Sequence, residues 1–237
     1  MFAIFKREMR SYFTSAYGYV FVGAYLLISG ILFSVFTLQM GTNSEISSYY
    51  AAILFAFVVL VPLLTMRSLA DERKQKTEQL LLTAPVSLPG MIFGKFLSAW
   101  CMFAATFLVG CLNLIPFYKF SAEEPNTAVI VGNIIAVLVV GLAFVAVGIF
   151  VSALTENQLI ASLGTMLVML LMLMTSFLNS YIPFAPIRQV LNWFSVYNRF
   201  SNFTYGLFDF AALLYYLSIA FIFLFLTVRV YEKRRWE

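Results

Sequence analysis

Six stretches of this sequence are each close to the length that a helix needs to cross a membrane, and none of them contains Asp, Glu, Lys or Arg. A spanning helix takes about 20 mostly apolar residues. The sequence therefore predicts an all-α membrane protein whose single transmembrane domain covers residues 1–237. The six predicted spans are residues 17–39, 47–66, 96–118, 128–152, 158–180 and 210–228.

The composition excludes most other classes of protein. Hydrophobic residues make up 62% of the chain and charged residues only 11%, whereas soluble domains carry about 25% charged residues. The chain has no His and only two Cys, which argues against the usual metal centres and histidine-based catalytic sites. We therefore expect no catalytic residue, metal ligand or cofactor in this chain. Its basic residues lie at span ends rather than in one patch, so nucleic acid is not an expected partner.

The same basic residues decide how the spans are oriented. Twelve of the fifteen Lys and Arg residues fall on one side of a six-span arrangement, and only Lys119, Arg188 and Arg199 fall on the other. Cytoplasmic loops of membrane proteins carry the excess of Lys and Arg. Both termini are therefore predicted to be cytoplasmic.

The residues ahead of the first span form an amphipathic pattern. The apolar side is Phe5, Met9, Tyr12, Phe13 and Ala16, and the polar side is Lys6, Arg7, Glu8 and Arg10. Such a pattern is typical of a helix that lies in the membrane interface. We predict an interfacial helix on the inner leaflet that uses Phe5, Met9, Arg10 and Phe13; a plain basic flank is the alternative.

The predicted cytoplasmic segment 67–95 is long enough to carry function. After a charged run at 71–74, Thr77 and Glu78 are suited to begin a short helix, and Pro85 is suited to end it. The turn between them consists of Leu80, Leu81 and Leu82. Leucines are stabilised by burial, so this turn is expected to pack either on the chain's own helices or on a partner protein.

The predicted outer segment 181–209 is aromatic but interrupted. Pro183 and Pro186 break the preceding helix, and polar residues keep the rest from forming another span. Trp and Tyr favour membrane interfaces. We therefore predict helices that dip into the outer interface and act as a gate or a docking surface. The residues assigned to this role are Trp193, Phe194, Tyr197 and Phe203.

Small residues form a stripe on the fourth predicted span, where Gly141, Gly148 and Ser152 share one helix face. Small residues let membrane helices approach closely, either within the chain or between two chains. The spans hold no Asp, Glu, Lys, Arg or His for a proton relay. The sequence 90–95 also lacks the spacing of a phosphate-binding loop. A self-contained secondary transporter is therefore not expected, and energy, if the protein needs it, is expected to come from outside this chain.

The order of these elements, together with one motif, resembles a known family: the permease subunits of ABC transporters of the type-2 exporter class. The motif covers residues 71–87 and continues at Gly94 and Lys95. It is similar to the family's acidic–basic pair, Gly-Thr-x-Glu, leucine run, Thr-x-Pro-Val-Ser and Gly-Lys, although Lys76 stands where the family often has Gly. The length and the C-terminal residues resemble the branch named after gliding motility, with a copper-maturation permease as a near relative.

The resemblance implies an export permease in the cytoplasmic membrane of a bacterium. Two permease chains, identical or related, then form the pore, and two copies of an ATPase subunit bind beneath them and hold ATP and Mg. A coupling helix is implied at about 77–87. The residues assigned to ATPase coupling are Glu72, Thr77, Glu78, Leu80, Leu81, Leu82 and Pro85. The alternative is a non-transporting subunit that relays ATPase motion to outer-side accessory proteins. An ATP-independent channel would leave the leucine turn without a role.

Overall fold

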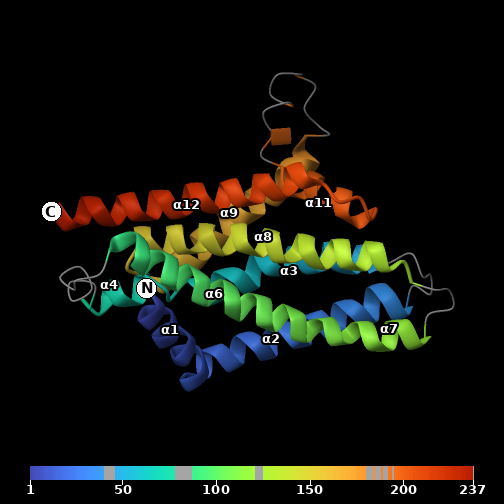
Figure 1. The fold of residues 1–237 in the computed structure, drawn as a ribbon, viewed down its shortest axis with the longest axis horizontal. Coiled ribbons are helices and arrows are strands. Elements are labelled where there is room, and N and C mark those ends of the chain that lie inside the picture. Colours follow the sequence, from blue (N-terminus) through green and yellow to red (C-terminus); the bar gives the residue numbers. More distant parts are fainter. Residues whose placement is uncertain are drawn as a thin grey trace.

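The long helices of the protein lie side by side along one axis (Figure 1). The computed structural model describes residues 1–39, 46–77, 87–120, 125–179, 184, 188, 192–193 and 195–236, and the regular structure within these ranges is helical. Six of the described helices are long and apolar enough to cross a membrane, as the sequence predicts. They are α2 (Ala16–Phe33), α3 (Ile46–Thr65), α6 (Leu88–Gly110), α8 (Thr127–Leu154), α9 (Gln158–Leu178) and α12 (Phe210–Trp236).

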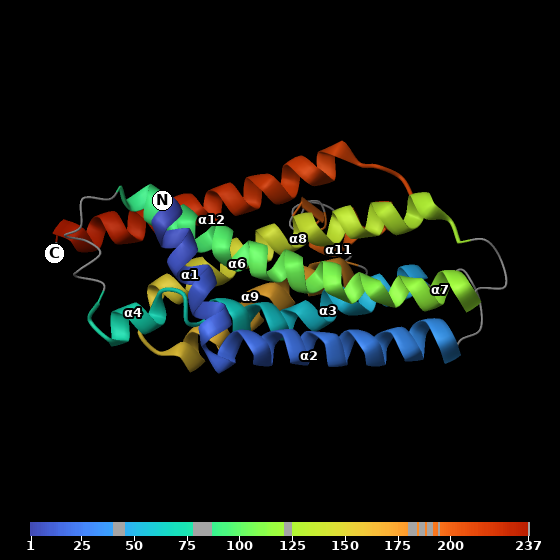
Figure 2. The same ribbon diagram turned by 60° about the horizontal axis from the view of Figure 1, so that its bottom comes forward.

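The two ends of this helical bundle differ in what they carry. Both termini lie at one end, together with α1 (Phe2–Thr14), α4 (Ala70–Lys74) and the beginning of α6 (Figures 1 and 2). We call this the terminal end. The opposite end, the far end, holds the short α7 (Leu114–Phe120) and the beginning of α8.

Two of the long helices change their geometry toward the far end. α2 continues into the π-helix η1 (Ser34–Gln39), and α6 passes through the 3₁₀-helix η2 (Cys111–Asn113) before α7 begins.

Helix α6 begins before the predicted third span. The predicted span began at Phe96, whereas α6 begins at Leu88, after Ser87 in an extended conformation and with Pro89 in the first turn. Proline is well tolerated at the start of a helix because its missing N–H has no partner there in any case. Lys95 consequently lies inside α6 and not in a loop before it.

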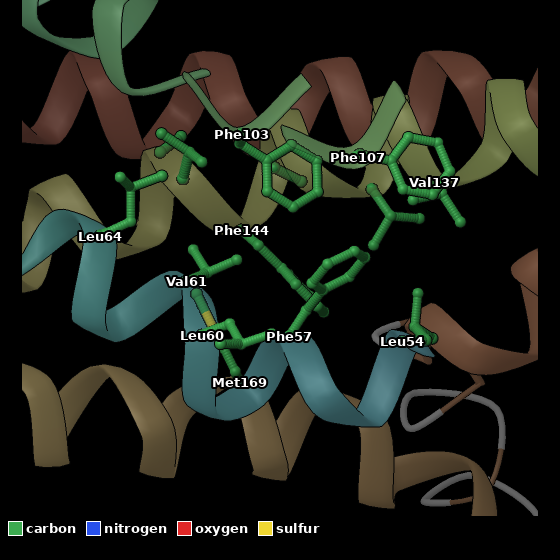
Figure 3. Packing of buried hydrophobic residues seen from close by; sticks show 14 of the residues in the cluster. Leu54, Phe57, Leu60, Val61, Leu64, Phe103, Phe107, Val137, Phe144 and Met169 are labelled. Carbon is green, nitrogen blue, oxygen red and sulfur yellow. The ribbon is translucent and has the colours of Figure 1, made fainter. Parts of the chain in front are cut away.

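Helix α8 is the centre of the bundle. It packs against α3, α6, α9 and α12, and a helix surrounded in this way is apolar on all sides. Phe144 of α8 lies among the rings of Phe57 and Phe103 and the side chains around them (Figure 3). The ring centroids of Phe57 and Phe103 are 4.8 Å apart in an edge-to-face arrangement, which is a favourable geometry for two aromatic rings.

The small residues of α8 explain how closely its neighbours approach. A Cβ atom added at Gly141 would lie 2.0 Å from the ring of Phe103, and one added at Gly148 would lie 2.2 Å from the hydroxyl oxygen of Thr65. Neither position has room for a side chain. For these two glycines the stripe therefore packs within the chain, which confirms the first of the two alternatives.

Candidate functional site

Helix α1 is docked closely onto the terminal end. It packs against both α2 and α6. A Cβ at Gly18 of α2 would lie 2.2 Å from the carbonyl oxygen of Tyr12, and a Cβ at Gly94 of α6 would lie 3.2 Å from that of Met1. Glycines at these two positions let the backbone of α1 come this near.

The faces of α1 are arranged differently from the sequence prediction in one respect. Phe5, Met9 and Tyr12 of the predicted apolar side are half-buried and Phe13 is exposed, so this side is partly packed on the bundle; Arg10 is exposed. Glu8, however, was assigned to the polar side and instead faces the bundle. The neighbouring Arg7 and the distant Lys95 pair with its charge, and a helical pattern alone does not show the pairing with Lys95.

Those partners form a closed ring of four charges that joins α1, α4 and α6. Arg7 and Glu8 belong to α1, Glu72 to α4 and Lys95 to α6. The Arg7 guanidinium lies 2.6 Å from the Glu8 carboxylate and 2.8 Å from that of Glu72. The Lys95 ammonium lies 3.1 Å from Glu8 and 2.8 Å from Glu72. We call these four residues the ion quartet.

Burial in the ion quartet is greatest at Lys95, whose side chain is 1% exposed. Besides the two carboxylates, its ammonium also donates a hydrogen bond to the carbonyl oxygen of Ser68, at 2.9 Å. The ammonium therefore has three oxygen partners: it donates hydrogen bonds to Glu8 and Ser68 and forms an ion pair with Glu72. Such complete pairing is what a charge needs when it is removed from water.

The charges of the quartet hold one another in the ionised form. Burial disfavours the Glu8 carboxylate and would raise its pKa, but the charges and hydrogen bonds of Lys95 and Arg7 outweigh burial, and the pKa of Glu8 lies below its ordinary value of 4.5. For Arg7, burial acts to lower the pKa, and Glu8 and Glu72 outweigh it, so the pKa is raised. Both pKa shifts favour the charged forms of Glu8 and Arg7, in agreement with the ion pairs that they make in the quartet.

A cavity of about 460 Å³ lies beside the quartet, between α1 and α4. Its lining is polar and includes Ser11, Arg67 and Asp71 as well as the quartet itself. The Arg67 guanidinium lies 3.5 Å from Asp71 and 5.0 Å from the centre of the Tyr17 ring. A cavity of this size and polarity can hold water, so the quartet has solvent on one side.

The other side of α4 is fastened to the end of α8. The Ser152 hydroxyl accepts hydrogen bonds from the backbone N–H groups of Leu69 and Ala70, at 3.2 and 3.0 Å, and so fixes the start of α4. At the end of α4, Arg73 lies 2.8 Å from Glu156, which follows α8. α4 is thus held from two sides.

The chain leaves α4 through an unusual backbone conformation. Lys76 has a φ of +57°, a left-handed conformation that favours glycine. Thr77 then turns back: its backbone N–H and its hydroxyl both donate to the carbonyl oxygen of Glu72, at 3.0 and 3.2 Å. The remaining residues predicted for ATPase coupling lie outside the described residues; they are Glu78, Leu80, Leu81, Leu82 and Pro85.

Comparison with known families identifies the chain. The family model described as ABC-2 family transporter protein matches residues 3–236. The chain belongs to the ABC-2 transporter family. It is the membrane component, or permease, of such a transporter, and the family implies a partnering ATPase subunit. A comparison with curated protein sequences finds no match.

This permease is a multi-pass membrane protein, and the permeases of the family are typically non-catalytic. Glu72 and Thr77, two of its predicted coupling residues, are brought together at the terminal end, but both bond within the chain. Their contact with an ATPase remains a prediction. Sequence reasoning missed Lys95 and Ser152, although the Gly94-Lys95 pair was part of the recognised motif.

The outer segment of the permease contains the helix α11 (Val196–Thr204), which packs on α8 and α9. Phe203 is fully buried there, and Tyr197 is half-buried, with its ring centroid 5.5 Å from that of Phe177. Trp193 is 74% exposed, and Phe194 lies outside the described residues. Two residues assigned to the outer role are therefore packed inward and one faces outward; a gating or docking role stays a prediction.

Proposed function

We propose that this permease couples ATP hydrolysis by a separate ATPase subunit to export across the cytoplasmic membrane. The terminal end would face the cytoplasm and receive the ATPase, and two permease chains would form the pore. The observation that carries the proposal is the ion quartet, because it joins the segment next to the predicted coupling helix to α1 and to a membrane-spanning helix. A push delivered at the terminal end therefore has a direct mechanical route into the bundle.

The distribution of charge supports this orientation. The terminal end collects the basic residues of α1, α4 and the end of α12, as expected for a cytoplasmic surface. Cysteine labelling from the cell exterior tests the orientation. Asn198, exposed on α11, should be labelled after substitution by cysteine, whereas Lys74 should be protected until the cells are opened.

ATPase binding is tested by purifying the tagged permease in mild detergent and identifying what copurifies. Leu81→Asp should release the ATPase subunit at unchanged membrane abundance of the permease, because a buried leucine contributes about 1.5–3 kcal/mol. Leu81→Met keeps the side chain apolar and should retain the ATPase. Loss of the permease itself from the membrane in Leu81→Asp would instead indicate that the leucine turn packs on its own helices.

A second function is favoured by the aromatic surface near α11. Trp193, Tyr205 and Phe208 are each at least 60% exposed, which suits an outer-side protein as well as interfacial lipid. The permease would then relay ATPase motion to that protein without moving a substrate. Liposomes containing the purified permease and ATPase distinguish the two functions: an exporter hydrolyses ATP faster when its substrate is present, whereas a relay responds only to the outer-side protein.

A further inference from the structure

We propose that Lys95 is the residue that transmits motion from α4 into α6, so that α4 and the third membrane span move together when the ATPase acts on the terminal end. This inference rests on the proposed coupling to an ATPase and assigns the step within the permease to one side chain. Its basis is the way in which Lys95 joins segments that are distant in the sequence.

The first step of the argument is the connection itself. The Lys95 ammonium binds Glu72, which belongs to α4, and the carbonyl oxygen of Ser68 in the turn that leads into α4. It also binds Glu8 of α1. One side chain of α6 thus holds α4, the turn before it and α1, and the adjacent Gly94 allows α1 to approach near enough for this.

The second step concerns why the connection is ionic. Replacing buried ion pairs by well-packed apolar residues is often neutral or stabilising, so stability alone does not call for a buried lysine. An ion ring with contacts of 2.6–3.1 Å is more sensitive to displacement than an apolar contact, because hydrogen bonds weaken steeply when their geometry is lost. The ring therefore fixes the relative positions of its helices.

The third step is the path by which a force reaches Lys95. The predicted coupling segment follows Thr77, and Thr77 is bonded twice to the backbone of Glu72. The Glu72 carboxylate binds Lys95. A displacement of the coupling segment consequently acts on Thr77, then on Glu72 and then, through Lys95, on α6.

The experiment measures the distance between α4 and α6 in the complete complex of permease and ATPase. Spin labels are attached to native Cys101 on α6 and to cysteine in place of the exposed Lys74 on α4, with Cys111 replaced by Ser. Distance distributions are recorded without nucleotide and after trapping with ATP and vanadate. Labelled permease is diluted with unlabelled permease so that the distance within one chain is measured. In the otherwise unchanged permease we expect this distance to have one narrow distribution that is the same in both states, because the two helices move as one body.

The test variant combines Glu8→Gln with Lys95→Met. The single change Lys95→Met would leave two carboxylates facing one guanidinium, so a change in distance could then come from the stranded charge and not from the lost link. The double variant keeps the Arg7–Glu72 pair and stays neutral overall, while α6 loses its link. We expect the α4–α6 distribution to broaden and to shift on trapping, while the ATPase remains bound and continues to hydrolyse ATP.

The matched control makes the same two types of change in an exposed pair on α12, Arg229→Met with Glu232→Gln, and should leave the distribution narrow. A narrow, unshifted distribution in the Glu8→Gln/Lys95→Met complex would overturn the role of Lys95. If the unchanged permease binds no ATPase, the proposed function fails instead. The distribution recorded without nucleotide then still decides whether Lys95 holds the two helices together.

Discussion

The two sides of α4 are both held by ion pairs, but the pairs differ in their surroundings. Toward α1 and α6, α4 is bound by the quartet, whose Lys95 is 1% exposed. Toward the end of α8, the Arg73–Glu156 pair has side chains that are 29% and 59% exposed. Breaking a buried ion pair is costly because it strands a charge, whereas an exposed pair contributes little. The burial of each ion pair, and not merely its presence, should therefore decide which side of α4 contributes more to the stability of the protein.

The largest loss of stability is expected when the buried ion quartet is broken. Lys95→Met should lower the free energy of unfolding by about 3–5 kcal/mol, as is usual when one partner of a buried ion pair is removed. Unfolding of the purified permease in detergent, followed by circular dichroism, measures this loss. The Glu8→Gln/Lys95→Met double variant should recover a large part of this loss, because the two charges that remain, on Arg7 and Glu72, neutralise each other. If the double variant is less stable than Lys95→Met, stranded charge is not the cause.

On the other side of α4, a smaller loss of stability is expected. It should come from removing the hydrogen bonds of Ser152 and not from breaking the ion pair. Ser152→Ala leaves the buried N–H groups of Leu69 and Ala70 without an acceptor and should cost about 1–3 kcal/mol. The control is Ser218→Ala, which removes an exposed hydroxyl from α12 and should change little. Equal effects of the two alanine substitutions in the same unfolding measurement would contradict this account of Ser152.

A substitution in the segment that follows α4 should increase the stability of the permease instead of lowering it. Lys76→Gly is expected to stabilise the permease by up to about 1 kcal/mol, because the left-handed conformation is unfavourable for residues with a Cβ and the gain is partly offset by a more flexible unfolded chain. Lys76→Ala keeps the Cβ and removes the charge, so it serves as the control. A gain in stability for alanine but not for glycine would point to the charge of Lys76 instead of its backbone.

The smallest effect is expected from the exposed ion pair. Glu156→Gln should change the free energy of unfolding by about 0.5 kcal/mol or less, and raising the salt concentration should remove even that difference. A loss comparable to that of Lys95→Met would show that the two sides of α4 are equivalent. Burial of the ion pairs would then not determine their contribution to stability.

The features that could be predicted from the sequence are those that depend on residues close together in the chain. Runs of apolar residues identify the six long helices, and the amphipathic pattern at the N-terminus corresponds to α1. Small residues at Gly141 and Gly148 indicated close packing, which the positions of Phe103 and Thr65 confirm. The departure at Lys76, where the family often has glycine, coincides with a positive φ.

The quartet could not be predicted in the same way. Lys95 was read as a basic residue beside a span, because a charged residue inside a membrane helix is expensive unless it is paired. Its partners Glu8 and Glu72 are far from it in the sequence, and nothing local shows that the three meet. The pairing explains why Lys95 can lie buried within α6, because Glu8 and Glu72 neutralise its charge there.

The central position of α8 has a consequence for biogenesis. Among the described helices, α12 is the one that α8 contacts most extensively, and α12 is synthesised last. The fourth span must therefore wait in the bilayer until α12 has been synthesised. Its small-residue face is already covered by then, because Gly141 and Gly148 pack on Phe103 of α6 and Thr65 of α3, whereas the face that α12 later covers is exposed to lipid. Lipid tails tolerate this exposure because α8 contains no charged residue. Chains that stop before α12 should insert normally, yet they should be recognised by membrane proteases as unfinished.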